Sequence, residues 1–223
     1  MQEVSGIPPA PRKADRRGES LQYDVFLGKV RVGEAVYQNR GIVDNEGQPR
    51  SLIIVDTRLV SFDDREEIYS DPETFLPMLV KRTVSRLLKQ EQIEERYDQD
   101  AFVLNITRKR FTVEHLTFKK DGPIQNSILL PYAVRDVPEL ALGWQITAHL
   151  PQRTYILTIA GIETVTVPAG TYETFHFTSV PAQLELWIST DKSRIPVKVI
   201  GSSFFDYRLE LRAYGLPQSE RAL

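Results

Sequence analysis

The side chains that could perform acid–base or metal chemistry are few in this sequence and poorly spaced for it. The three histidines, His115, His149 and His176, lie far apart, and no pair has the H-x-x-x-H or H-E-x-x-H spacing of a metal site. The chain has no cysteine, which excludes disulfides, thiol nucleophiles and Cys-ligated metals. We therefore expect structural or surface roles for the histidines, no bound metal and no cofactor.

One group of carboxylates is dense enough to consider as a site. Asp63, Asp64, Glu66 and Glu67 would suit a cation or an acid–base pair, but they lack the glycine and the ligand spacing of a calcium loop. A solvated acidic loop is the favoured interpretation. The motifs of serine hydrolases, phosphate loops and S-x-x-K enzymes are also absent. We expect a protein that is not an enzyme, and a hydrolase or sugar-active enzyme built on these carboxylates is the least favoured hypothesis.

Aromatic and basic side chains do not indicate a ligand or nucleic-acid site any more strongly than the carboxylates do. Trp144 and Trp187 would suit a ligand cleft, although core positions are the favoured interpretation. The short basic runs at 108–110 and 119–120 flank expected strands, where they protect sheet edges from aggregation rather than bind nucleic acid. With a net charge of −2, the molecule as a whole has no field to attract nucleic acid or an anionic membrane.

Alternation of apolar and polar residues with period two runs through most of the chain and predicts β-strands. It is clearest between 161 and 200, where we expect four strands and tight turns at 167–170 and 191–194. Pro196 either begins the last of these strands or places it at a sheet edge. The segment 84–97 fits a charged helix or a long hairpin arm, and we take it as a hairpin.

The excess of strands over helices predicts the fold class. We find roughly ten to twelve strands but one helix candidate, 127–142, in which Ser127 would be the cap and Pro131 and Pro138 keep the helix short. An antiparallel sheet can leave one face in water, but the other must be covered, and each large apolar side chain left exposed forgoes about 1.5–3 kcal/mol. A single short helix cannot cover a flat sheet of this size. We therefore predict a mainly β protein with a single curved antiparallel sheet, an open half-barrel or barrel with one short helical segment.

The chain divides into three parts. Residues 1–17 are rich in proline and basic residues and predict a flexible N-terminal arm, 18–214 predict a single β-rich domain, and 215–223 predict a C-terminal tail. No apolar run approaches the ~20 residues of a transmembrane helix, and no signal peptide is visible in the sequence given.

Several motifs in a fixed order resemble a bacterial family of exported proteins, domain of unknown function 3108. They are G-E-S-L-Q-Y-D-V at 18–25, V-G-E-A at 32–35, Y-S-D at 69–71, T-V-T-V-P-A-G-T-Y-E-T-F at 164–175 and L-E-L-W-I-S-T-D-K-S-R-I-P-V-K-V at 184–199. The resemblance covers about residues 18–214. It implies an open half-barrel similar to periplasmic lipoprotein carriers and a place in the periplasm or cell envelope after removal of a signal peptide. It implies no activity.

Two functions fit these expectations. The favoured one is a non-enzymatic envelope protein whose concave, apolar sheet face binds a lipid, an acyl chain or a hydrophobic protein segment. The alternative is an envelope scaffold or protein-interaction module whose interior is filled by its own side chains, and whose strand edges or 84–97 arm bind partners. The predicted apolar lining of the concave face consists of Phe175, Phe177, Leu184, Leu186, Ile188, Tyr207, Leu209 and Leu211.

Overall fold

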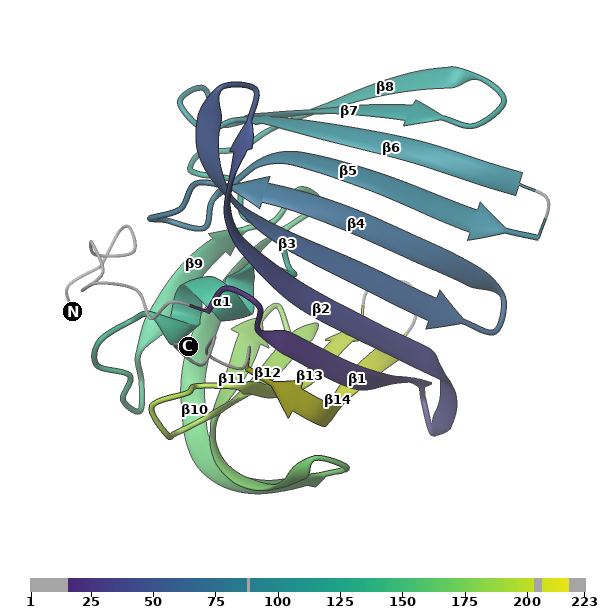
Figure 1. Cartoon of the computed structure of the whole chain (residues 1–223). Helices are drawn as coiled ribbons and strands as arrows, with labels where there is room; N and C mark the ends of the chain where they lie inside the picture. The colour runs from purple at the N-terminus through teal and green to yellow at the C-terminus, as the bar shows by residue number, and fades with distance from the viewer. Residues whose placement is uncertain (1–15, 88, 203–205, 217–223) are drawn as a thin grey trace, which may run out of the picture.

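The computed structural model describes residues 16–87, 89–202 and 206–216. They form one antiparallel sheet of 14 strands and one short helix (Figure 1). The strand order is β8-β7-β6-β5-β4-β3-β2-β1-β14-β13-β12-β11-β10-β9, so β8 and β9 are the two edges and the sheet is not closed. The predicted fold class is confirmed, although the strands outnumber the ten to twelve expected.

The strand bounds are as follows. They are β1 Ser20–Leu27, β2 Val30–Asn45, β3 Gln48–Leu59, β4 Phe62–Ser70, β5 Pro77–Arg86, β6 Lys89–Asp98, β7 Val103–Lys109, β8 Val113–Lys119, β9 Gln145–His149, β10 Thr154–Val167, β11 Gly170–Val180, β12 Leu184–Ser189, β13 Pro196–Ser202 and β14 Asp206–Gly215. The segment 84–97 lies in the β5–β6 hairpin as predicted, and Pro196 begins β13.

Two meanders make up the sheet. Every pair of neighbouring strands is consecutive in sequence except β1 and β14, whose register runs from Ser20↔Gly215 to Leu27↔Tyr207. The first and last strands therefore lie side by side in the middle of the sheet and join the two meanders. Figure 1 shows the β1–β8 meander and the β9–β14 meander curving around the helix α1.

The helix α1 spans Leu130–Arg135 and is shorter than the predicted 127–142 segment. Pro131 lies in its first turn as expected, but Ser127 does not cap it. Instead the Asn126 carbonyl accepts a bond from the Leu130 N–H at 3.0 Å, and its side-chain oxygen accepts one from the Ile128 N–H at 2.8 Å. Among the described residues, no helix is both long and apolar enough to cross a bilayer.

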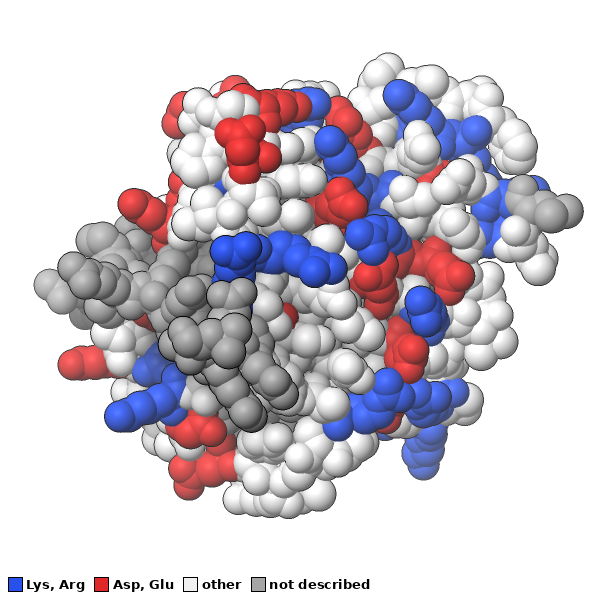
Figure 2. Space-filling view, in the orientation of Figure 1, with Lys and Arg blue, Asp and Glu red and all other residues white. Residues whose placement is uncertain are grey.

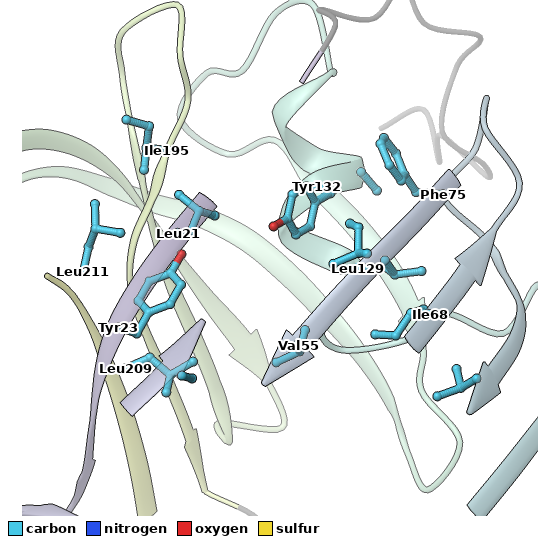
Figure 3. Packing of buried hydrophobic residues seen from close by; sticks show 14 of the residues in the cluster. Leu21, Tyr23, Val55, Ile68, Phe75, Leu129, Tyr132, Ile195, Leu209 and Leu211 are labelled. Carbon is cyan, nitrogen blue, oxygen red and sulfur yellow. The ribbon is translucent and has the colours of Figure 1, made fainter. Parts of the chain in front are cut away.

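Helix α1 is buried on all sides because the sheet curls around it. Leu129, Tyr132 and Ala133 pack in one hydrophobic cluster with residues of β1–β7, β13 and β14 (Figure 3). Leu130 and Val134 pack in a second cluster with residues of β9–β12. Because residues three and four apart share a helix face, this short helix connects the two clusters.

The gap between the two sheet edges is bridged at one point by the segment that follows β8. Ile124 forms a parallel bridge with His149 at the end of β9, and the Gln125 N–H donates to the His149 carbonyl at 2.9 Å. From the β6–β7 turn, the Gln99 side chain donates to the Ile124 carbonyl and accepts its N–H, both at 2.9 Å. These polar bonds connect the two meanders across the opening of the sheet.

Most of the predicted arm, residues 1–15, lies outside the described residues. Arg16, within the predicted arm, is not solvated as expected. Its side chain is 9% exposed and pairs with Asp136 at 2.5 Å, directly after α1. This ion pair therefore anchors the start of the described chain to the end of α1.

Candidate functional site

A cavity of about 50 Å³ lies between the α1 segment and the middle of the sheet. Its lining is Leu21, Tyr23, Tyr37, Ser127, Ile128, Pro131, Tyr132, Pro196, Val199, Tyr207 and Leu209. The volume exceeds the ~10–15 Å³ that one water molecule requires but is far below the ~300–1,000 Å³ of a typical ligand pocket. The cavity can hold water or a small part of a ligand, and a longer ligand requires the α1 segment to shift.

The pairing of β1 with β2 positions two of the cavity tyrosines. Leu21 lies opposite Tyr37, and Tyr23 lies opposite the small Ala35, which leaves room for the Tyr23 ring. The rings of Tyr23 and Tyr37 meet edge to face with centroids 5.2 Å apart. Such an arrangement is a favourable one for aromatic pairs, so both rings are held in place on the concave face.

A glycine allows the third tyrosine to reach the cavity. Tyr207 on β14 pairs with Gly201 on β13, and its ring lies over the glycine. A Cβ atom built on Gly201 would lie 2.3 Å from Cε1 of Tyr207, closer than real atoms approach. Any larger residue at 201 would therefore displace the ring.

The hydroxyl of the fourth tyrosine is buried without a partner. The Tyr23 hydroxyl donates to the Pro196 carbonyl at 2.8 Å, whereas the Tyr132 hydroxyl has no hydrogen-bond partner among the described residues. Tyr132 is only 1% exposed. An unsatisfied buried polar group costs about 1–3 kcal/mol, so a ligand atom that accepts this hydrogen bond would gain that energy.

Burial also fixes the protonation of these phenols. It raises the pKa of Tyr23, Tyr37, Tyr132 and Tyr207 above the ordinary value. The four hydroxyls remain protonated through the physiological pH range. The cavity therefore combines apolar walls with neutral hydrogen-bond donors, which suits an apolar molecule that carries an oxygen acceptor.

Comparison with known proteins identifies the family. The family model described as "Protein of unknown function (DUF3108)" matches residues 22–212. The chain belongs to the DUF3108 family. A comparison with curated proteins finds no match.

One solved structure shares the fold of this DUF3108 chain at low sequence identity. The β-barrel-like protein of domain of unknown function DUF1849 from Brucella abortus has a TM-score of 0.52 at 10% identity, covering 92% of this chain and 100% of that chain. A candidate lipoprotein from Parabacteroides distasonis has a TM-score of 0.31 at 9% identity, covering 96% of this chain and 100% of that one, which is too weak to indicate a shared fold. The Brucella structure supports a barrel-like fold but gives no information about a ligand.

The DUF3108 sheet places the predicted lining residues on one face. The registers Phe177↔Leu186, Leu186↔Val199 and Val199↔Leu209 align three of them in one row across β11–β14. The other five lie two residues away along the same strands and so share this face. Of the eight, Tyr207 and Leu209 line the cavity. The other six are buried in the two hydrophobic clusters: Phe175, Phe177, Leu184, Leu186, Ile188 and Leu211. Their role in binding remains a prediction.

Neither the α1 side of the cavity nor the β1–β2 side was predicted from the sequence. Leu21 and Tyr23 alternate with polar residues, as expected of one face of a strand, but no local pattern shows that β1 pairs with β14. The same holds for Tyr132, whose position depends on where the loop after β8 crosses the sheet. A tyrosine in an apolar helix segment was the available signal, since a buried phenol usually needs a partner.

The acidic residues lie on a strand, so the expected solvated loop is wrong. Asp63 and Asp64 point to opposite faces of β4, and Asp64 is buried, accepting a hydrogen bond from Arg82 Nε at 2.9 Å. Glu66 is on the same face as Asp64, 3.6 Å from Arg82, with 15% of its side chain exposed. Burial raises the pKa of Glu66 to about 7, although Arg82 acts in the opposite direction. Among the described residues, no group of acidic or histidine side chains could hold a metal ion.

The histidines do not meet at a site. His176 stacks on Trp187 with ring centroids 4.3 Å apart, on the face opposite Phe177 and Leu186. Its two ring nitrogens lie 2.8 Å from Glu163 and from Glu185. Because Trp187 also donates to Glu163 at 3.1 Å, it belongs to this outer cluster rather than to the cavity.

Proposed function

We propose that this DUF3108 protein is a non-enzymatic cell-envelope protein that holds a lipid-like or other hydrophobic ligand between the α1 segment and the sheet. The buried Tyr132 hydroxyl, unpaired among the described residues at a mostly apolar cavity, carries the proposal. Apolar walls such as Leu21 and Leu209 would contact a hydrocarbon chain, and the phenol would donate to an ester or carboxyl oxygen.

The size of the cavity defines what must happen on binding. At about 50 Å³ it is too small for an acyl chain, so the chain would take the space now filled by Ile128, Pro131 and Tyr132. The α1 segment then acts as an internal substitute for the ligand. This explains why the helix carries apolar side chains on both of the faces that pack into the clusters.

The envelope location in this proposal follows from the resemblance to exported proteins. Fractionation of cells that express the gene under its own promoter would test it. We expect the protein in the periplasmic or membrane fraction, and recovery with the cytosol would overturn this part of the proposal.

Native mass spectrometry of protein purified under mild conditions, with organic extraction of the same sample, tests ligand binding. We expect an added mass of a lipid-like molecule on the parent and its loss in Val199→Phe, which fills the cavity. Ile162→Phe adds the same ring at a position 51% exposed and should keep the ligand. A parent that carries nothing, and takes up no fluorescent fatty acid when one is added, would overturn the proposal.

One observation favours the alternative, a scaffold with a self-filled interior. Seven of the eight predicted lining residues belong to the protein's own hydrophobic clusters and the eighth, Tyr207, packs against one of them, so the interior is largely filled by its own side chains. In that case the β5–β6 hairpin would bind a partner protein. A protein with this hairpin shortened should then lose a chemical cross-link to its envelope partner that the parent forms. Neither the parent nor this variant should take up fatty acid.

A further inference from the structure

The turns that join the strands of the first meander are chemically different at its two ends. At one end lie the turns β1–β2, β3–β4, β5–β6 and β7–β8, which alternate with the opposite turns because the strands are antiparallel. We call residues 28–30, 59–62, 86–87, 89 and 109–113 the hairpin rim. At the other end lie the turns 44–47, 71–76 and 98–102.

Charge is segregated between these two ends. The hairpin rim carries five cations and no carboxylate: Lys29, Arg86, Lys89, Lys109 and Arg110. None of the five forms an ion pair within the described part of the chain. The opposite turns carry six carboxylates and no cation: Asp44, Glu46, Asp71, Glu73, Asp98 and Asp100. Figure 2 shows cationic side chains at the upper right, where rim turns lie in Figure 1, and carboxylates at the upper left, with both charges mixed over the strands between them.

The rim also exposes large apolar side chains. Val60 is 92% exposed, Phe111 is 78% exposed and Leu87 is fully exposed, while the opposite turns expose no large apolar side chain. Each of these groups would gain free energy by leaving water. Their position at the tips of separate turns lets them enter a soft surface together without burying any strand.

Cations lie directly over the rim aromatics. Lys89 Nζ lies 5.8 Å from the centroid of the Phe111 ring, and the Arg110 guanidinium lies 5.6 Å from it. On the neighbouring hairpin, Arg86 lies 5.1 Å from the Phe62 ring. Apolar side chains with cations around them are the arrangement that binds the interface of an anionic bilayer, where the rings lie among the acyl chains and the cations meet phosphates.

We infer that the hairpin rim docks the protein on the surface of an anionic phospholipid membrane. The carboxylates of the opposite turns would be repelled by the same surface, so the molecule would stand with its strands directed toward the bilayer. The net charge of −2 conceals this separation of charge, because the cations of the rim and the carboxylates of the opposite turns nearly cancel. The inference does not depend on a ligand in the cavity, since docking uses only rim residues.

Sedimentation with phospholipid vesicles tests the docking. We expect the parent to bind vesicles of equal parts phosphatidylcholine and phosphatidylglycerol, to ignore phosphatidylcholine alone, and to be released by salt. Lys89→Gln with Arg110→Gln should weaken binding by on the order of twenty-fivefold, about fivefold for each cation near an anionic surface. Leu87→Ser with Phe111→Ser should also remove most of the binding.

Two matched controls should bind like the parent. Ile42→Ser removes an apolar side chain that is 65% exposed and lies toward the opposite turns, and Lys192→Glu reverses an exposed cation in the β12–β13 turn. Equal loss of binding in these controls would overturn the inference, as would a parent that ignores anionic vesicles.

A tryptophan at the rim gives a second measurement that does not depend on weakened variants. Phe111→Trp should shift its emission to the blue on anionic vesicles and be quenched by brominated acyl chains, because the ring enters the bilayer interface. An emission spectrum that does not change with vesicles would contradict the inference. A change of equal size in the parent, from Trp144 and Trp187, would contradict it too.

Discussion

Tyr132 has opposite effects on stability and on the proposed binding, and this makes it informative at the scale of single residues. Its hydroxyl is buried without a described partner, so Tyr132→Phe removes an unsatisfied group. We expect the free energy of unfolding of the ligand-free protein to rise by about 1 kcal/mol, and the affinity for a fluorescent fatty acid to fall about five- to tenfold. Urea denaturation and fluorescence titration measure the two effects.

Tyr155→Phe is the matched control, because the Tyr155 hydroxyl donates to Gln183 at 3.1 Å outside the cavity. It should lower stability slightly and leave fatty-acid affinity unchanged. If Tyr132→Phe instead destabilises the protein and binds the fatty acid as the parent does, the hydroxyl has a structural partner and no ligand role.

Glu66 makes stability depend on pH. Burial raises the pKa of Glu66 to about 7 in the folded protein, above the ordinary value of 4.5. The folded state therefore holds this proton more tightly, and the protein loses stability as pH rises from about 4.5 through 7. Glu66→Gln should be more stable than the parent by about 2–3 kcal/mol near pH 8 and equal to it near pH 4. Thermal denaturation across this range measures the difference.

Glu67→Gln, on the opposite face of β4, controls for the loss of a carboxylate. Its side chain is 33% exposed and pairs with Arg65 at 3.4 Å. We expect a change within about 0.5 kcal/mol at either pH. A constant difference between Glu66→Gln and the parent across the whole pH range would show that Glu66 does not titrate in this window.

At the scale of elements, α1 is anchored by a buried ion pair. Both Arg135 terminal nitrogens donate to the Glu19 carboxylate, at 2.6 and 2.7 Å, and both side chains are 1% exposed. Arg135→Met leaves the Glu19 charge buried alone and should destabilise the protein by about 3–5 kcal/mol. Adding Glu19→Gln should recover part of this loss, which a double-mutant cycle by urea denaturation measures.

Arg65→Met offers a comparison at an exposed pair with Asp56, where we expect less than about 1 kcal/mol. Losses of the same size at the two pairs would contradict the anchoring role of Arg135. So would unchanged hydrogen exchange of the α1 amides in Arg135→Met.

The elements also show what the sequence could predict. Strands, the turns at 167–170 and 191–194 and the start of β13 follow from local patterns, and the need to curl follows from the ratio of strands to helices. The buried β4 carboxylates could not be predicted, because they depend on Arg82 of β5 at the paired position. The cavity depends on the β1–β14 pairing and on the path of the loop carrying α1, both of which join residues more than a hundred positions apart.

At the scale of the whole molecule, Gln99 connects the two halves of the open sheet. Its amide donates to the carbonyls of Pro77, at 2.7 Å, and Ile124, and it accepts the Ile124 N–H. Gln99→Leu removes all three bonds, leaves buried partners unsatisfied, and should destabilise the protein by about 2–3 kcal/mol. Hydrogen exchange at 122–126 should increase, because this segment spans the gap between the two sheet edges at that point.

Gln145→Leu, an exposed position on β9, should leave both stability and exchange close to the parent values. Exchange at 122–126 that stays slow in Gln99→Leu would mean that the bridge from Ile124 to His149 holds the two meanders without Gln99.

The whole fold is one sheet that curls because it has a single short helix to cover it, and the proposed ligand lies where that helix meets the sheet. Photolabelling with a fatty acid that carries a diazirine, followed by peptide mapping, tests this most directly. We predict labels on β1, on β14 and on residues 126–132, and their loss in Val199→Phe. Labels confined to the outer strands β5–β8, or no competition by unlabelled fatty acid, would contradict a binding site beneath α1.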